Sequence, residues 1–154
     1  MRICSFLKTE QVLLNLKAED KPSILQELVS FLKENGIIKD DKKVLEELSK
    51  REELGSTALS RGIALPHALL PSLKSPVLAL GLSLKGVDFG GKEGKPTHVF
   101  FVLLGNNEDP GKQLKILAHV CRLIKETDFV SKIKKIRSAG DACHILEEEE
   151  RKIE

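Results

Sequence analysis

The 154-residue sequence contains no tryptophan and no tyrosine, and six phenylalanines make up its whole aromatic content of 4%. Aromatic side chains on which nucleic-acid bases could stack are therefore scarce. An excess of one charge sign is also missing, because 25 lysines and arginines against 23 aspartates and glutamates leave a formal net charge of +2. A balance this even gives no strong field toward nucleic acid or an acidic membrane surface, and we expect neither as a partner.

Long hydrophobic runs are absent too. The longest, residues 99–104, is far shorter than the roughly 18 residues of a membrane-spanning helix. The first residues lack the apolar stretch and the small-residue cleavage site of a signal peptide. The cysteines, Cys4, Cys121 and Cys143, are odd in number and lack CxxC spacing, which argues against a disulfide framework and a zinc ribbon. We therefore expect a cytoplasmic protein without membrane insertion.

No motif for a bound cofactor or metal is present. The patterns G-x-x-x-x-G-K-[ST] and G-x-G-x-x-G are missing, and the glycines between Gly86 and Gly94 precede no helix that could hold a phosphate at its amino end. Metal-ligand spacing is also lacking among the histidines, which are His67, His98, His119 and His144. We expect neither a cofactor nor a metal.

What is present is an ordinary globular balance of 41% hydrophobic and 31% charged residues, which suits one domain over residues 1–154. Strands are predicted at residues 12–17, 77–85 and 98–104. In the second, Leu78, Leu80, Leu82 and Leu84 alternate onto one face, and the third is apolar throughout, as in a central strand. The link between these two is too short for a helical crossover, so we expect them to be antiparallel or near neighbours.

Helices are predicted from caps and apolar spacing. Asp20 caps a first helix that ends at Asn35-Gly36, and Asp40 or Asp41 caps a second that ends before Gly55. Residues 55–76 are expected to be irregular apart from a short apolar piece at 63–65. Further helices are expected at residues 111–127, 129–137 and 139–152. The fold class is therefore α/β (α+β mixed), a three-layer domain whose mixed parallel/antiparallel sheet has helices on both faces.

Two helix faces can be predicted in more detail. The helix at 111–127 has one polar side, with His119 between Lys115 and Arg122, so we expect His119 to be solvated. Its apolar stripe consists of Leu114, Leu117, Cys121 and Ile124, with Ile116, Val120 and Leu123 beside it. The acidic run at residues 147–150 is typical of the solvated face of a terminal helix.

His67 is the histidine placed best for chemistry. Pro66 fixes its own φ and favours an extended Leu65, so the imidazole is displayed from a stiffened backbone beside the small Ala68. Reactive groups are often found on loops held by a rigid scaffold. The alternative is a histidine that merely ends a strand. His98 is expected to be a satisfied core histidine, and His144 has no visible partner.

The segment around His67 carries a long signature. It consists of Arg51-Glu52, then Ser56-Thr57, then Gly62-Ile63-Ala64-Leu65-Pro66-His67-Ala68. This pattern resembles the type-2 enzyme IIA domains of the bacterial phosphoenolpyruvate-dependent phosphotransferase system, the mannitol, fructose and nitrogen-regulatory class. The resemblance runs from the helix after Asp20 through residues 113–118 to the terminal helix. The Gly-Ser-Thr segment is most similar to the nitrogen-regulatory branch.

The resemblance implies a phosphocarrier that accepts a phosphoryl group on His67 from an HPr-like phosphocarrier protein and passes it to a IIB-type domain. It implies that Arg51 neutralises the phosphoryl oxygens. Ser56 and Thr57 are candidates to donate hydrogen bonds to the phosphoryl group, with capping of the backbone as an equally good role. No bound cofactor is implied.

Two other functions stay open. The first is a nitrogen-regulatory module whose phosphorylation state controls binding to a regulator or a transporter, without sugar phosphorylation. Phosphate adds about 1.5 to 2 negative charges at one point, enough to switch a protein contact. The second is a copy that keeps the fold but is not phosphorylated.

The sequence departs from the family pattern at Gln113, where members usually carry a second histidine. A glutamine amide can hydrogen-bond to imidazole or phosphate but cannot become cationic. We therefore expect Gln113 at the catalytic site, with phosphorylation retained and onward transfer slower or lost. His119 is no substitute, because six residues along a helix turn it by about 240° onto another face. A smaller departure is the apolar Leu69-Leu70-Pro71. Its two interpretations are a hydrophobic docking rim and packing under a loop, and we favour packing.

Overall fold

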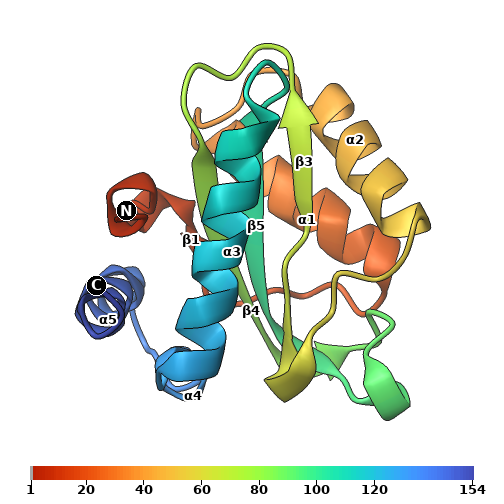
Figure 1. The fold of residues 1–154 in the computed structure, drawn as a ribbon. Helices are drawn as coiled ribbons and strands as arrows, with labels where there is room; N and C mark the ends of the chain where they lie inside the picture. The colour runs from red at the N-terminus through yellow and green to blue at the C-terminus, as the bar shows by residue number, and fades with distance from the viewer. Residues whose placement is uncertain (1) are drawn as a thin grey trace.

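The computed structural model describes residues 2–154, and its centre is a five-stranded sheet (Figure 1). The strands are β1 (Val12–Leu13), β2 (Ile63–Ala64), β3 (His67–Leu70), β4 (Val77–Val87) and β5 (Thr97–Asn106). Their order is β1-β4-β5-β2, and β3 also pairs with β5. The β4–β5 pair is antiparallel, whereas β1–β4, β2–β5 and β3–β5 are parallel. The predicted mixed sheet and the antiparallel pairing of its two long strands are confirmed.

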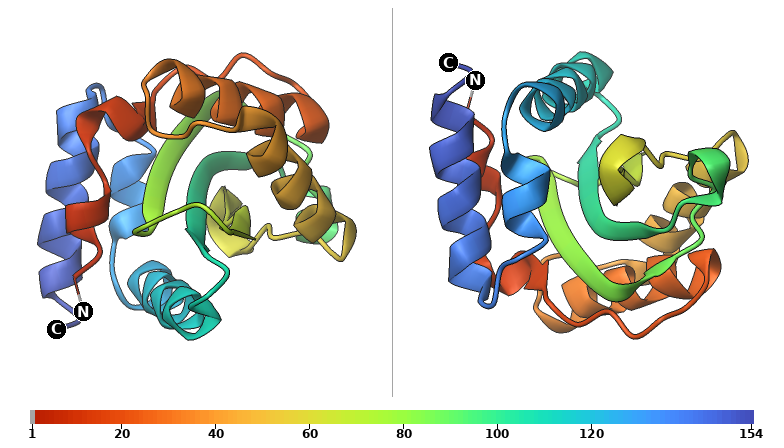
Figure 2. Two further views of the ribbon diagram at one scale, coloured as in Figure 1. Left: turned by 90° about the horizontal axis from the view of Figure 1, so that it is seen from above. Right: turned by 90° about the horizontal axis from the view of Figure 1, so that it is seen from below.

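Helices cover both faces of this sheet (Figures 1 and 2). On one face lie α1 (Lys21–Glu34) and α2 (Asp41–Glu53), and on the other lie α3 (Pro110–Glu126) and α4 (Phe129–Ile133). The last helix, α5 (Ala139–Arg151), packs on α4 and on the amino-terminal segment beside β1. Four short 3₁₀ turns complete the described elements: Cys4–Phe6, Thr9–Gln11, Ser60–Gly62 and Lys92–Gly94. Each layer of helices buries its own apolar cluster against the sheet, so the predicted three-layer arrangement is confirmed.

The predicted caps of the first two helices are confirmed. Asp20 Oδ1 accepts from Ser23 N at 2.9 Å, and Asp40 Oδ1 accepts from Lys43 N at 3.1 Å. These bonds satisfy amide groups that have no partner inside the helix. They fix the residues at which α1 and α2 begin.

The long strands alternate largely as predicted. Leu78, Leu80 and Leu82 face the cluster under α3–α5, while Ala79 faces the cluster under α1 and α2. Leu84, expected on the same inner face, is exposed. The register with β5 shifts between Leu82 and Val87, and this irregularity turns the strand after Leu82.

Two strand predictions were wrong. The strand expected at residues 12–17 ends at Leu13, although Leu16 N still donates to Leu82 O at 2.9 Å. Residues 67–70, expected to be irregular, form β3, which pairs from His67↔Leu103 to Leu70↔Asn106. Four residues give too little alternation for a sequence prediction, and the partner strand that stabilises them lies far along the chain.

The predicted inner face of α3 was wrong at Leu114. Leu114 is 67% exposed, while the buried residues are Gln113, Ile116, Val120, Leu123 and Ile124. The sequence contains two overlapping apolar stripes at helical spacing, and periodicity alone did not show which of them meets the sheet. The helix therefore buries a polar amide at residue 113 and presents a leucine to solvent beside it.

The acidic run at residues 147–150 was predicted to be solvated, and half of it is not. Glu149 is buried and pairs with Lys132 at 2.9 Å and with Lys152 at 2.7 Å, and it also accepts from Asp128 N at 3.1 Å. Glu147 and Glu148 on the other side of α5 stay partly exposed. Burial of Glu149 is tolerated because each oxygen has a cationic or amide partner.

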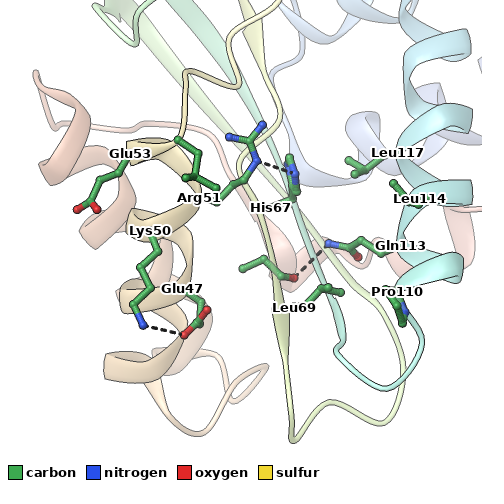
Figure 3. Close-up of a pocket in the computed structure, with 12 residues that line it drawn as sticks. Glu47, Lys50, Arg51, Glu53, His67, Leu69, Pro110, Gln113, Leu114 and Leu117 are labelled. Atoms are coloured by element: carbon green, nitrogen blue, oxygen red, sulfur yellow. Dashed lines mark hydrogen bonds and ion pairs between the residues drawn. The ribbon is translucent and has the colours of Figure 1, made fainter.

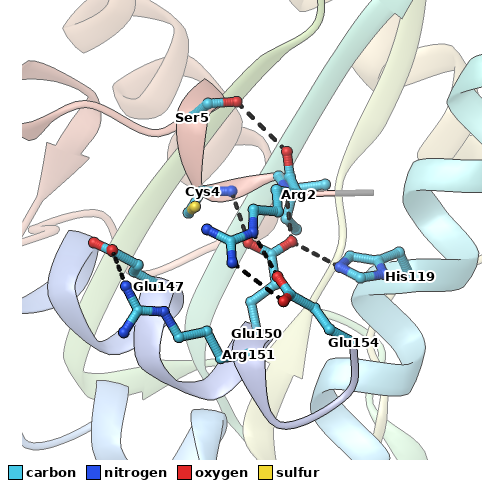
Figure 4. A network of polar contacts seen from close by, with 9 residues as sticks. Arg2, Cys4, Ser5, His119, Glu147, Glu150, Arg151 and Glu154 are labelled. Atoms are coloured by element: carbon cyan, nitrogen blue, oxygen red, sulfur yellow. Dashed lines mark hydrogen bonds and ion pairs between the residues drawn. The ribbon is translucent and has the colours of Figure 1, made fainter.

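Glu150, at 1% exposure, joins three segments of the chain (Figure 4). Its carboxylate accepts from the Ile3 and Cys4 amides, the second at 3.0 Å, and lies 2.7 Å from His119 Nε2. The prediction that His119 is solvated was therefore wrong, because a charged residue from α5 reaches across to α3. This contact depends on the fold and has no local signal in the sequence.

No helix within residues 2–154 is long and apolar enough to cross a membrane.

Candidate functional site

His67 lies at the amino end of β3, on the floor of a depression of about 650 Å³ between α2 and α3 (Figure 3). Pro66 precedes it, and the Pro66 carbonyl accepts from Leu103 N at 3.0 Å, which anchors the backbone next to β5. The rest of the lining comes mainly from the last turns of α2 and the first turns of α3: Glu47, Lys50, Arg51, Glu53, Leu54, Ala68, Leu69, Pro110, Gln113, Leu114 and Leu117.

The two ring nitrogens of His67 have different partners. Nδ1 lies 2.8 Å from the Leu65 carbonyl oxygen, which can only accept, so Nδ1 carries the proton. Nε2 lies 3.2 Å from Arg51 Nε, which can only donate, so Nε2 holds the lone pair. The nucleophilic nitrogen of the neutral ring is therefore Nε2, and it is aimed at the guanidinium.

The surroundings of His67 also favour the neutral ring. Burial is the largest influence and lowers the pKa of His67 below its ordinary value, and the nearby positive charge of Arg51 lowers it further. The hydrogen bond to Leu65 and the charge of Glu52 act in the opposite direction but do not reverse the shift. At neutral pH the Nε2 lone pair is thus available for reaction.

Arg51 is held in place by the end of α2. Its Nη1 donates to Gly55 O at 2.9 Å, while its Nε donates to His67. Gly55 has a φ of +149°, a conformation that side chains rarely adopt, and this lets the chain turn back so that its carbonyl meets Arg51. A fixed guanidinium next to a nucleophile is suited to binding an anion there.

Gln113, in the first turns of α3, is the third predicted residue at this site. Its Nε2 donates to Ala68 O at 3.1 Å, so it binds the backbone of the residue that follows His67. Its Oε1 is buried without a hydrogen-bond partner in the described part of the chain, against Gly105, where a Cβ would overlap it. The structure thus brings Arg51, His67 and Gln113 together around one depression.

Ser56 and Thr57, predicted as phosphate ligands, do not line this depression. Thr57 is buried, and both its backbone N–H and its hydroxyl donate to the Glu52 carboxylate. The Ser56 hydroxyl donates to Phe89 O and accepts from Ala58 N at 3.0 Å. Both side chains support the backbone under the site, and contact with a phosphoryl group stays a prediction for them.

Glu52 is the residue that sequence reasoning missed. It is 7% exposed, lies next to Arg51, and pairs with Lys21 Nζ at 2.8 Å. The available signal was the Arg-Glu pair in the signature, which does not show that one carboxylate points inward.

His98 is half-buried, and its Nδ1 lies 3.0 Å from Ser83 O. In the apolar segment at residues 69–71, Leu70 is packed in the core as expected, whereas Leu69 lines the depression and Pro71 is exposed. His144 was expected to have no partner, but its Nε2 lies 2.8 Å from Glu148 Oε1.

A metal site has no support in this geometry. Across residues 2–154 no group of three or more histidine, cysteine, aspartate or glutamate side chains is arranged to hold a metal ion.

Residues 5–149 match the family model described as "Phosphoenolpyruvate-dependent sugar phosphotransferase system, EIIA 2". The chain belongs to this family. EIIA proteins are phosphotransferase components, and Arg51, His67 and Gln113 lie within the matched range.

Relatives in this family have both regulatory and sugar-transport names. The chain is 33% identical over 147 residues to a nitrogen regulatory protein of Bradyrhizobium diazoefficiens, covering 95% of each chain. It is 26% identical over 151 residues to a fructose-specific EIIABC component of Bacillus subtilis, where 98% of this chain spans 24% of the longer protein.

Solved EIIA structures share the fold. Nitrogen regulatory protein IIA-Ntr of Neisseria meningitidis superposes with a TM-score of 0.83 at 26% identity, covering 94% of this chain and 98% of that one. The complex of enzyme IIA-mannitol with phosphorylated IIB-mannitol of Escherichia coli has a TM-score of 0.74 at 17% identity, with 92% and 97% coverage. At that identity the second likeness shows the fold alone.

Proposed function

We propose that this EIIA protein is a phosphocarrier, that it works in the cytoplasm as one domain, and that His67 Nε2 accepts the phosphoryl group. The observation that carries the proposal is the pair of ring contacts: Leu65 holds the proton on Nδ1 at 2.8 Å, and Nε2 faces Arg51 in an open depression. The donor is an HPr-like phosphocarrier protein charged from phosphoenolpyruvate. The first acceptor we propose is a IIB-type domain.

The transfer step conserves atoms and charge without moving a proton through Gln113. The Nε2 lone pair of His67 attacks the phosphorus, and an N–P bond forms as the N–P bond to the donor imidazole breaks. The Nδ1 proton stays on His67, hydrogen-bonded to Leu65 O. The donor ring leaves with the electron pair of its broken bond. The protein contributes mainly by positioning the ring and by neutralising charge.

Arg51 is the residue proposed to neutralise the transferred group. Its Nε already points at Nε2 of His67, so a phosphoryl oxygen bound to that nitrogen would come within reach of the same donor. A planar guanidinium can donate two parallel bonds to such oxygens. Because Nη1 is anchored at Gly55 O, little side-chain freedom is left to lose on binding.

Gln113 is proposed to act in a different way from a second histidine. Its amide donates one N–H to Ala68 O, which leaves the second N–H of the NH₂ group for a phosphoryl oxygen. An amide cannot supply a positive charge or a proton when the phosphoryl group leaves. We therefore propose that His67 is phosphorylated normally and that onward transfer is slow.

A regulatory output is the second candidate function. Slow onward transfer would leave the phosphorylated form long-lived, which suits a protein whose two states bind a regulator or a transporter differently. The nitrogen regulatory relative that matches over 95% of both chains supports this alternative. Sugar transfer requires delivery to a IIB-type domain, whereas regulation requires only a difference in binding between the two states.

Intact mass spectrometry tests the acceptor. The protein is incubated with phosphoenolpyruvate, enzyme I and an HPr-like protein of proven activity, beside folded His67→Ala and His144→Ala variants. We expect a gain of one acid-labile phosphoryl group in the wild type and in His144→Ala, whose ring is exposed and pairs with Glu148. We expect no gain in His67→Ala. A wild type that stays unlabelled, or a labelled His67→Ala, would refute the proposal.

The same labelled protein separates the two outputs. Rapid loss of label to a IIB-type domain supports sugar transfer. Retention of the label, with a changed affinity for a regulator or transporter, supports the regulatory function.

A further inference from the structure

A buried carboxylate lies beneath the His67 site and belongs to none of the roles above. Glu52, the last residue but one of α2, has three hydrogen-bonding partners. Lys21 Nζ lies 2.8 Å from Oε1, Thr57 N donates to the same oxygen at 3.2 Å, and the Thr57 hydroxyl donates to Oε2. The carboxylate thus holds both the backbone and the side chain of Thr57.

Thr57 passes this constraint on to His67 through one residue, Leu65. Its carbonyl accepts from Leu65 N at 3.0 Å, and the Leu65 carbonyl oxygen lies 2.8 Å from His67 Nδ1. The path from Glu52 to the ring therefore consists of hydrogen bonds joined by the backbone of Thr57 and Leu65, and both of these residues are buried. Moving Thr57 would move the acceptor that determines which ring nitrogen carries the proton.

Lys21 pairs with Glu52 from a position where a positive charge is locally unfavourable. It is the first residue of α1, and positive charge is disfavoured at a helix amino end. Its Nζ nevertheless lies between the Glu52 carboxylate and the buried ring of Phe89, 4.5 Å from the ring centroid. A buried carboxylate without such a partner is costly, so the contact with Lys21 offsets part of the cost of burying Glu52.

We propose that Glu52, paired with Lys21, is a positioning residue for His67: it fixes Thr57 and, through the Leu65 peptide, keeps the His67 proton on Nδ1 and the lone pair of Nε2 toward Arg51. The inference rests on the proposed function of His67. It assigns Glu52 no contact with the phosphoryl group.

The charge of Glu52 supports the same role. It raises the pKa of His67, in opposition to burial and Arg51, and so does the Leu65 hydrogen bond that Glu52 helps to hold. Removing the Glu52 carboxylate should therefore lower the pKa of His67 in two ways: its negative charge is lost, and the Leu65 carbonyl is no longer held in place. The second change also releases the Nδ1 proton from its fixed acceptor.

The test compares Glu52→Gln and Thr57→Val with two references. Thr57→Ser keeps the hydroxyl that donates to Glu52. Glu46→Gln makes the same chemical change as Glu52→Gln on the same helix, but at an exposed residue paired with Lys50 at 2.9 Å. For each folded variant, the tautomer and pKa of unphosphorylated His67 are measured by nitrogen-15 NMR, and the rate of phosphorylation by an HPr-like donor is measured by rapid acid-free quench and mass spectrometry.

We expect Glu52→Gln to populate the tautomer protonated on Nε2, to lower the pKa of His67, and to slow phosphorylation by about 10- to 100-fold, the range for a small misplacement of a reacting group. Thr57→Val should shift the tautomer in the same direction, Thr57→Ser should restore most of it, and Glu46→Gln should match the wild type. If Glu52→Gln does not fold, Thr57→Val against Thr57→Ser decides the question.

An unchanged His67 tautomer in folded Glu52→Gln and Thr57→Val would overturn the inference, even if phosphorylation slowed, because Glu52 would then act without positioning the ring. A tautomer shift in a protein whose wild type is never phosphorylated would support the positioning role and refute the proposed function. The two failures are therefore distinguishable.

Discussion

At the scale of single residues, the reactivity of a histidine here depends on what faces its Nε2. In His119 and His144 that nitrogen meets a carboxylate, from Glu150 and Glu148 respectively. In His67 it meets the Nε–H of Arg51, so the lone pair is directed at a donor and the proton stays on Nδ1. The pKa of His67 is lowered by burial, which keeps this state populated at neutral pH.

The pH dependence of phosphorylation follows from this shift. As the pH falls through the lowered pKa of His67, Nε2 binds a proton and the rate should drop about tenfold per pH unit. Because the pKa lies below the ordinary value of about 6.5, the fall should be centred at a lower pH than for an ordinary histidine, and the rate should level off toward pH 8. Single-turnover rates with isolated phosphorylated donor, compared with the NMR titration of His67, provide the measurement.

Gln113 provides a control for the pH dependence of phosphorylation. Since the amide does not titrate, the acceptor should contribute one ionisation, and Gln113→His should add a second. An inflection above pH 6.5 that is absent from the NMR titration of His67 would contradict the assignment of the nucleophile.

At the scale of elements, the sequence predicted the helix starts at Asp20 and Asp40 and the long strands β4 and β5, because caps and alternation act locally. It misjudged α3, where Leu114 and Gln113 are neighbours and only the sheet decides which is buried. It missed β3, whose stability comes from pairing with a distant strand.

The candidate site was predictable to the same extent. The signature located His67, Arg51 and Gln113, and these do meet around one depression. It did not reveal that the Thr57 hydroxyl is committed to Glu52, because that contact requires α2 to turn one carboxylate inward. Residue types indicated the chemistry, whereas the direction of each side chain came from tertiary packing.

The docking of α5 yields a stability prediction. Glu150→Ala removes the acceptor of the Ile3 and Cys4 amides and the partner of His119, and should destabilise the protein by about 3 kcal/mol, as expected for breaking a buried polar cluster. Urea unfolding monitored by circular dichroism measures the change.

Glu148→Ala is the matched control on the same helix. It loses an exposed pair with His144 and should cost at most about 0.5 kcal/mol. Equal losses in the two variants would show that Glu150 does not hold the amino-terminal segment to α5.

At the scale of the whole molecule, the His67 depression lies between two helix ends that each present a leucine. Leu54 after α2 is 84% exposed, and Leu114 of α3 is 67% exposed. Exposed leucines on both sides of a reactive group are suited to an apolar contact with the protein that delivers the phosphoryl group.

Substituting these leucines should therefore weaken docking of the HPr-like donor. Leu54→Ser and Leu114→Ser should each raise the apparent KM for phosphorylated donor by about tenfold with little change in the maximal rate, because burial of a leucine contributes about 1.5 kcal/mol or more. Leu84→Ser, at an exposed leucine far along β4, is the control. A fall in the maximal rate with unchanged KM would place these leucines in the chemistry instead.

Arg2, the first residue that the structure describes, and Glu154 lie side by side next to α5 (Figure 2), where Arg2 Nε and Glu154 Oε1 are 2.6 Å apart. They sit beyond the β1 edge of the sheet, while His67 belongs to the strand on the other side of β5. A short linker could thus close the chain into a ring, with new ends opened at the Gly36 turn, and leave the face around His67 intact. The same geometry would let this fold be inserted into the loop of another protein with its reactive face still turned outward.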